Sequence, residues 1–135
     1  MMNDKISIES RKEKARELHR SGYNCSQCVF MAFEDVHGLS GDVAAKISVG
    51  LGGGVGGQRQ VCGALTGLSM VAGCKVYASP SDKMAAYGKV KACCGEFKER
   101  NGSIVCAELV GPLRKPCVGY IEDAVEILAN VLADE

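Results

Sequence analysis

The sequence predicts an all-α fold: a compact single-domain bundle of about six or seven helices, with a glycine-rich loop before the central helix. Three observations lead to this prediction. Apolar residues recur every three or four positions through most of the chain, which is the period of a half-buried helix. Helix-capping residues and glycines separate these segments. The strict alternation of apolar and polar residues that indicates strands is nearly absent.

Paired capping residues mark the first two helices. A capping box joins a Ser or Asn at the N-cap to a Glu or Gln three residues later. The pattern occurs at Ser10 with Glu13 and at Asn24 with Gln27, and a glycine follows each helical stretch. The two predicted helices cover about residues 8–21 and 25–37.

The middle of the chain is rich in glycine. Residues 40–42 offer a serine or an aspartate to start a short third helix, which runs into the glycines. Residues 47–51 alternate apolar and polar side chains and predict one short strand. The next helix begins near Cys62 and carries Gly63 and Gly67 on one face. Because each helical glycine costs about 1 kcal/mol relative to alanine, we expect a backbone or a ligand to come close to these two.

Three further helices complete the predicted bundle. The fifth begins at the Ser-Pro pair of residues 79–80 and ends near Asn101. Its buried face is predicted to hold Met84, Tyr87, Val90, Cys94 and Phe97. Ser103 is expected to cap a short helix, and Pro116 to open the last one.

The charge pattern excludes several partners. Sixteen basic and sixteen acidic side chains cancel, so we expect neither a nucleic-acid partner nor an anionic-membrane surface. The longest uncharged run, residues 60–74, contains glycines and is shorter than the ~20 residues of a membrane-spanning helix, which predicts no membrane insertion. The N-terminal segment MMNDKISIESRKEKARELHR has neither a twin arginine nor an apolar signal stretch, so we expect a cytoplasmic protein.

Cysteine is the anomaly of the composition, with eight in 135 residues. In the absence of an export signal, metal binding or thiol chemistry is favoured over disulfides. A free cysteine is also often a small buried hydrophobe. This interpretation suits the cysteines that fall in the middle of predicted helices, which are Cys74, Cys93 and Cys94.

Four other cysteines stand at four predicted helix starts: Cys25, Cys62, Cys106 and Cys117. The unpaired N–H groups and the positive dipole end at such positions lower the pKa of a thiol and stabilise its thiolate. If these helix ends converge, sulfur-only ligation suits an iron–sulfur cluster or a structural zinc ion. Cys25 also forms a C-x-x-C pair with Cys28, whose spacing allows thiol chemistry without a metal.

The glycine run also contains a G-x-G-x-x-G pattern at Gly52, Gly54 and Gly57. This pattern indicates a dinucleotide site only inside a βαβ unit with an acidic residue about 20 positions later. The sequence has too little strand signal for such a unit and no acid at that distance. We therefore predict no nucleotide site.

The motif residues together resemble a known family. Asn24-Cys25, the hexapeptide CGALTG of residues 62–67, Cys106 and Cys117 are similar to the redox-active proteins named for a C…GCAxxG…C…C cysteine arrangement. The chain reads C-G-A-x-x-G where the family pattern puts the glycine before the cysteine. The resemblance implies a bacterial or archaeal protein that holds an iron–sulfur cluster, of unspecified type, through Cys25, Cys62, Cys106 and Cys117.

These observations define one expected function and two alternatives. We expect residues 1–135 to form a single cysteine-rich redox domain that transfers electrons within an oxidoreductase system and meets a redox partner protein. The residues expected to approach the cluster with their backbone are Gly54, Gly57 and Gly63. The auxiliary thiols that could replace or resolve a motif cysteine are Cys28, Cys93 and Cys94.

The first alternative is a metal-free thiol–disulfide oxidoreductase, which would use Cys25 with Cys28 or Cys62 with Cys106. The second is a binding module stapled by zinc. The apolar helix faces also allow a homodimer.

Overall fold

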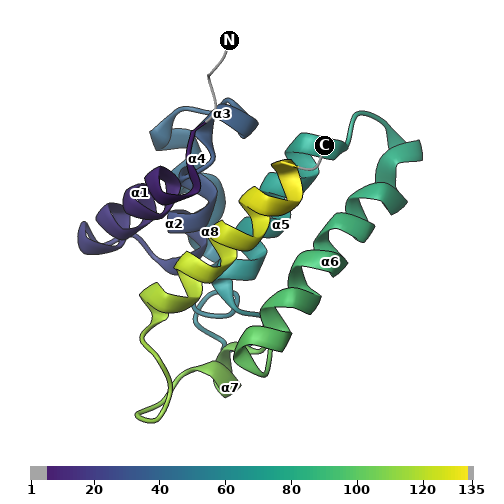
Figure 1. Cartoon of the computed structure of the whole chain (residues 1–135). Helices are drawn as coiled ribbons and strands as arrows, with labels where there is room; N and C mark the ends of the chain where they lie inside the picture. The colour runs from purple at the N-terminus through teal and green to yellow at the C-terminus, as the bar shows by residue number, and fades with distance from the viewer. Residues whose placement is uncertain (1–5, 134–135) are drawn as a thin grey trace.

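The computed structural model describes residues 6–133, and its helices pack around α5 (Figure 1). The α-helices are α1 (Ile8–Arg20), α2 (Cys25–Met31), α3 (Glu34–His37), α4 (Gly41–Ser48), α5 (Gly63–Val76), α6 (Lys83–Asn101), α7 (Cys106–Leu109) and α8 (Cys117–Ala133). Two 3₁₀ turns, η1 (Val49–Leu51) and η2 (Pro80–Asp82), precede the glycine loop and α6. Within residues 6–133 there is no strand, only an isolated antiparallel bridge between Val61 and Val105. The predicted all-α fold is confirmed.

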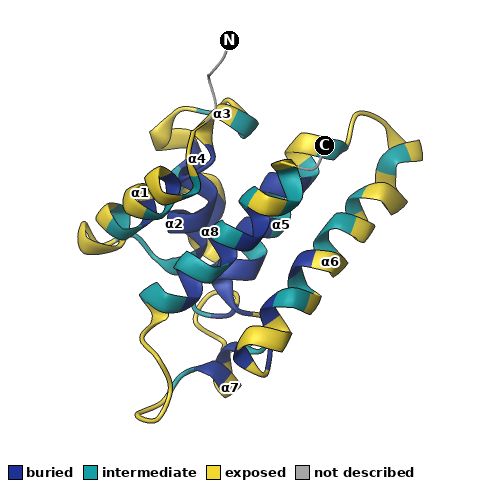
Figure 2. Ribbon diagram, viewed as in Figure 1, coloured by how far each residue is buried: buried dark blue, intermediate teal, exposed yellow. Residues whose placement is uncertain are grey.

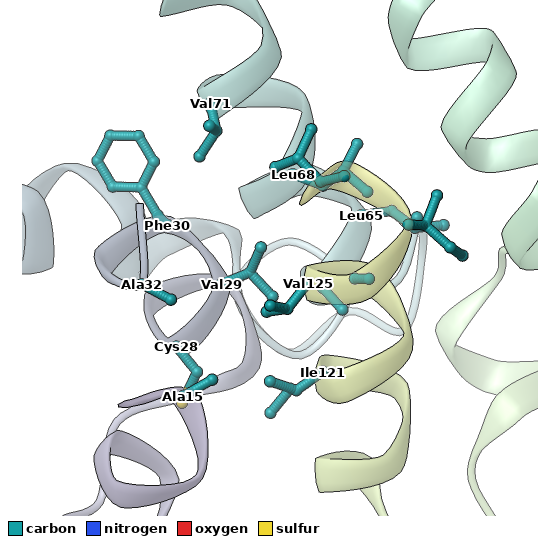
Figure 3. Packing of buried hydrophobic residues seen from close by; sticks show 14 of the residues in the cluster. Ala15, Cys28, Val29, Phe30, Ala32, Leu65, Leu68, Val71, Ile121 and Val125 are labelled. Atoms are coloured by element: carbon teal, nitrogen blue, oxygen red, sulfur yellow. The ribbon is translucent and has the colours of Figure 1, made fainter. Parts of the chain in front are cut away.

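The core lies where α2, α5 and α8 meet, as Figure 3 shows from close by. Fully buried side chains from all three helices fill it, among them Val29, Leu65, Leu68, Ile121 and Val125. Burying one such side chain contributes about 1.5–3 kcal/mol. Over the part of the chain that the structure describes, no helix is both long and apolar enough to cross a membrane.

The helix starts test the capping predictions. Asn24 and Gln27 form the predicted capping box, because each side chain bonds to the backbone N–H of the other. The box predicted at Ser10 with Glu13 is wrong. The N-cap of α1 is Ser7, whose Oγ accepts a hydrogen bond from the Ser10 amide at 3.0 Å. Ser7 and Ser10 are both residues of a type that caps helices, and Ser7 is the one that caps α1.

Two predicted elements in the first half differ from the structure. The predicted helix over 25–37 is interrupted after Met31, because Phe33 leaves helical geometry (φ −120°, ψ 39°) and turns its buried ring into the core. The strand predicted over 47–51 is wrong, since α4 continues directly into η1. Its five-residue alternation is too short to outweigh a helix that Ser40 has already capped.

Helix α6 is well packed at only one end. The buried residues of α6 are Cys93, Phe97 and Asn101, all in its C-terminal half. Met84 and Tyr87, predicted to be buried, are 65% and 52% exposed. Figure 2 shows this change along the helix, from exposed and half-buried residues near its start to buried ones near its end.

The remaining helices frame the site. The Ser103 hydroxyl accepts a hydrogen bond from the Val105 amide at 3.0 Å and does not cap α7, whose N-cap is Val105. The prediction that Ser103 caps this helix is therefore wrong. α8 begins at Cys117, directly after Pro116, as the sequence predicted.

Candidate functional site

Four cysteines that are distant in the sequence line one small cavity of about 40 Å³. They are Cys25, Cys62, Cys106 and Cys117. The rest of the wall is formed by Gly53, Arg59, Gly63, Leu109, Val110 and Tyr120. The structure thus brings the four predicted motif cysteines together at one place.

Each of these cysteines stands at a helix start, as the sequence predicted. Cys25, Cys106 and Cys117 are the first residues of α2, α7 and α8, and Cys62 is the N-cap of α5. The positive ends of these helix dipoles therefore lie beside the thiols.

A short antiparallel contact holds two of the cysteines next to each other. On either side of the Val61–Val105 bridge, the Cys62 amide donates to the Ile104 carbonyl at 2.9 Å. The Cys106 amide donates to the Gln60 carbonyl at 2.6 Å. The bridge thus brings the two segments together, and the side chains of Cys62 and Cys106 line the same cavity.

The glycine loop packs directly on the Cys25 end of α2. The side-chain Nδ2 of Asn24 donates a hydrogen bond to the Val49 carbonyl at 3.0 Å, which connects the N-cap of α2 to η1. The Gly53 amide donates to Cys25 Sγ at 3.5 Å. A Cβ atom on Gly63 would overlap that same sulfur. The close approach predicted for this glycine is confirmed, and the neighbour is the Cys25 thiol.

The second glycine predicted to allow a close approach meets a backbone. A Cβ atom on Gly67 would lie 2.6 Å from the Ser26 carbonyl oxygen, so α5 and α2 touch there through their main chains. The prediction for Gly67 is confirmed.

Five consecutive loop residues, 53–57, adopt the left-handed conformation, with φ between +61° and +77°. Four of them are glycines, which tolerate it, but Val55 is β-branched and costs about 1–3 kcal/mol there. A Cβ atom on Gly54 would lie 2.6 Å from Arg59 Cα. Gly54 and Gly57 are not among the residues that line the cavity, whereas Gly53 and Gly63 are.

Arg59 is a site residue that was not predicted from the sequence. Its Nη1 donates to Cys106 Sγ at 3.6 Å, and this bond is the main reason that the pKa of Arg59 is raised. When ionised, Cys106, Cys117 and Cys25 raise the pKa of Arg59 further through their charges. The sequence feature that could have identified Arg59 is its isolation, because it is the only charged residue between Lys46 and Lys75.

The pKa is raised at two of the cavity thiols, and burial is the largest cause at both. Burial raises the pKa of Cys62 to about 12, although the backbone N–H groups of Ala64 and Leu65 lower it. Partial burial of the Cys117 thiol also raises its pKa, although the residue as a whole is exposed. The prediction that a helix start lowers the thiol pKa is therefore wrong for these two residues. Both stay protonated at neutral pH unless a cation compensates the charge.

The auxiliary thiols lie outside the cavity. Cys28 is fully buried, its Sγ bonds to the Tyr23 carbonyl at 3.6 Å, and burial raises its pKa to about 12. Burial likewise raises the pKa of Cys93 to about 12 and that of its neighbour Cys94. All eight cysteines are free thiols.

The donor chemistry of the cavity fits a sulfur-ligated centre. Four thiols face one space, and two of them already accept a hydrogen bond from an N–H group. Within residues 6–133, however, no three His, Cys, Asp or Glu side chains are grouped as a ready metal site. A space of about 40 Å³ also suits one to about three water molecules. A larger group would fit only if part of the cavity wall moved. The glycine loop that carries Gly53 is a non-helical part of this wall.

Comparison with known proteins identifies the family. A family model described as "Putative redox-active protein (C_GCAxxG_C_C)" matches residues 23–131, which include all four cavity cysteines. The chain belongs to this family. The resemblance inferred from the motif cysteines is thereby confirmed.

One relative extends the match to nearly the full length. A protein of Archaeoglobus fulgidus, described as "Uncharacterized protein", is 28% identical over 145 residues. The match covers 94% of this chain and 96% of the relative. No solved structure matches the chain.

Proposed function

We propose that this member of the C_GCAxxG_C_C family is an electron-transfer protein whose redox centre is an iron–sulfur cluster. The ligands in this proposal are Cys25, Cys62, Cys106 and Cys117. The observation that carries it is the convergence of these four thiols, from four helix starts, on one cavity. The electrons would pass to or from a partner oxidoreductase.

The protonation of the thiols favours a metal-containing centre. A metal binds the thiolate form, so a buried neutral thiol must lose its proton when the metal enters. Because burial raises the pKa of Cys62 and Cys117, a free thiolate is costly at these positions, and a cation offsets that cost. When bound, the cluster would supply the one-electron couple.

Two N–H donors have defined tasks in this proposal. The Gly53 amide at Cys25 Sγ and the Arg59 guanidinium at Cys106 Sγ both stabilise negative charge on sulfur. Hydrogen bonds to ligand sulfurs raise the potential of a centre, because they favour its more negative, reduced state. Leu109, Val110 and Tyr120 close the rest of the wall and limit access of water.

The same observations favour the cluster over the two alternatives. The Cys25–Cys28 pair is a poor exchange couple, because Cys28 is buried, bonded to a carbonyl and has a pKa of about 12. The Cys62–Cys106 pair is disfavoured because burial raises the pKa of Cys62 to about 12. A zinc staple is unnecessary in a chain with its own buried core. The eight free thiols suit a reducing compartment such as the cytoplasm.

The test is the content of iron, sulfide and zinc after anaerobic preparation, together with the absorption spectrum. We expect iron and inorganic sulfide in similar amounts and a visible absorption band that bleaches on reduction. Each single Cys→Ser change at positions 25, 62, 106 and 117 should lower the cluster content by several-fold. Cys74→Ser is the matched control, because Cys74 is exposed and does not line the cavity.

Two results would contradict the proposal. One is stoichiometric zinc without sulfide, which would make the four thiols a structural zinc site. The other is a protein without metal whose cavity thiols form a reversible disulfide, which would favour thiol–disulfide exchange.

A further inference from the structure

The open half of α6 and the adjoining part of α5 form an apolar groove, here called the α5–α6 groove. Two hollows of about 510 and 370 Å³ meet at Gly73 and Ala86, which line both. The residues that define the groove are Phe30, Met70, Gly73, Tyr77, Ala86 and Tyr87. The groove therefore combines a floor of small residues with large aromatic walls.

The N-terminal half of α6 is not covered by its own chain. Between Lys83 and Ala92 no residue is buried. Met84, Tyr87 and, at the end of α5, Tyr77 are each at least 50% exposed. Large apolar side chains that gather on one surface, rather than standing singly, mark an interaction site.

The sequence pattern of α6 requires a cover along its whole length. Met84, Tyr87, Val90, Cys94 and Phe97 recur at the spacing of one helix face. The described chain buries Phe97 at the far end of this stripe and leaves Met84 and Tyr87 at the near end in solvent. One continuous apolar stripe is therefore covered over only part of its length.

We infer that a second copy of this chain fills the α5–α6 groove and forms a two-fold symmetric dimer. A two-fold interface uses the same patch on both partners, so the patch must be complementary to itself. The groove meets this condition, because the large Tyr87 and the small Ala86 both line it and belong to the same helix, with the exposed Met84 beside them. The large side chains of each copy would pack against Gly73 and Ala86 of the other copy.

The exposed apolar side chains supply a large part of the area that a dimer needs. An aromatic side chain buries about 150–250 Å², so the exposed halves of Tyr77 and Tyr87, with those of the smaller Ile47 and Met84, supply on the order of 400 Å². That is about half of the ~800 Å² that one partner contributes to a stable interface. The groove walls between these side chains supply further apolar area.

The positive charge beside the groove gives a way to distinguish a second copy from a foreign partner. Lys83 and Lys91 lie on the open half of α6, and Lys91 lines the groove. Two copies would bring like charges together, so salt should strengthen their association by screening. An acidic foreign partner would show the opposite salt dependence.

The first measurement is the molar mass in solution, by sedimentation or light scattering, between about 1 and 100 μM protein. We expect a dimer that tightens from low to moderate salt, and a monomer for Tyr87→Glu and for Met84→Glu. The matched control is Leu113→Glu, because Leu113 is 98% exposed and lies in the loop before α8. Circular dichroism establishes that each variant keeps its helices.

The second measurement uses two cysteines as reporters within the same chain. Cys74 lines the groove and Cys117 lines the cavity, and both are exposed in the single chain. We expect maleimide to label Cys74 at least tenfold more slowly in the dimer than in Tyr87→Glu. The labelling of Cys117 should be the same in both proteins.

Three results would overturn the inference. The first is a wild-type monomer throughout this concentration range, with rapid labelling of Cys74. The second is a dimer that persists in Tyr87→Glu while Cys74 stays unprotected, which would put the interface elsewhere. The third is an association that weakens as salt rises. None of these measurements requires a metal, so their outcome is independent of the test for the cluster.

Discussion

The two ends of the α5–α6 pair contrast sharply. At the cysteine end, the α5 backbone approaches α2 so closely that Gly67 has no room for a methyl group, and Phe97 anchors α6 in the core. At the other end, a Cβ atom on Gly73 would have nothing within 4 Å, and Met84 lies in solvent. The cysteine end is complete within one chain, whereas the open end still needs a surface to cover it. The two proposals thus place redox chemistry and assembly at opposite ends of the same helices.

Truncating the apolar stripe of α6 at each end gives the largest expected difference. Phe97→Ala should lower the free energy of unfolding by about 3–5 kcal/mol, because the ring is fully buried. Met84→Ala should lower it by less than about 0.5 kcal/mol in dilute solution, because that side chain is exposed. Urea denaturation of both variants at about 1 μM measures the difference.

The same pair of variants sharpens the comparison at higher concentration. If a second copy covers the open end, the cost of Met84→Ala should grow with protein concentration, since association stabilises the folded state. Equal costs for the two variants in dilute solution would contradict the division of α6 into a packed end and an open end.

Adding one methyl group at each end of α5 should have opposite effects. Gly67→Ala should destabilise the fold by about 1–3 kcal/mol, because the new methyl group meets the Ser26 carbonyl, which cannot move without shifting α2. Gly73→Ala should stabilise the dilute protein by up to about 1 kcal/mol, because it replaces a helical glycine whose surroundings are open. Thermal unfolding of both variants measures the sign of each change.

The Gly73 variant also connects stability with assembly. The methyl group would occupy the groove floor, so Gly73→Ala should weaken self-association while it stabilises the single chain. A stabilising effect of Gly67→Ala would show that the contact between α5 and α2 is looser than its distances indicate.

The buried thiols are expected to make stability depend on pH. In the unfolded chain these thiols lose their protons near pH 8.5, whereas the folded chain keeps Cys28, Cys62 and Cys93 protonated to about pH 12. A raised pKa in the folded state contributes stability below about pH 8.5, and this contribution is lost as the pH approaches 12. Each of these thiols should therefore lower the free energy of unfolding by up to about 1.4 kcal/mol for every pH unit between about 8.5 and 12.

The measurement is the free energy of unfolding at pH 7.5, 9 and 10, with reductant and chelator present. Cys93→Ala should make the alkaline decline less steep, because one buried thiol no longer titrates. An identical slope in the variant would show that other groups cause the decline.

Local signals explain what could be predicted from the sequence. Asn24 and Gln27 bond to each other across three residues, so their capping box needs no information from the rest of the chain. The cysteines at helix starts could be recognised for the same reason. The family pattern then singled out the four thiols that share the cavity.

Several of the incorrect or missing predictions depend on contacts between distant segments. The pairing of Val61 with Val105 leaves no local pattern, and it is this contact that sets Cys62 beside Cys106. Arg59 acquires its role only when Cys106 is in place. Val55 is held in a left-handed conformation that its own side chain disfavours. The exposure of Met84 differs from the pattern because one chain does not supply the expected cover.

The spread of the four cavity thiols along the chain also determines when the site comes into existence during biosynthesis. Cys25 is made early, but the wall is complete only after Cys117 has been synthesised and α8 has docked against the earlier helices. Closing such long loops is slow and follows local helix formation. An ion or cluster held by all four thiols would therefore enter a chain whose distant helices have already docked.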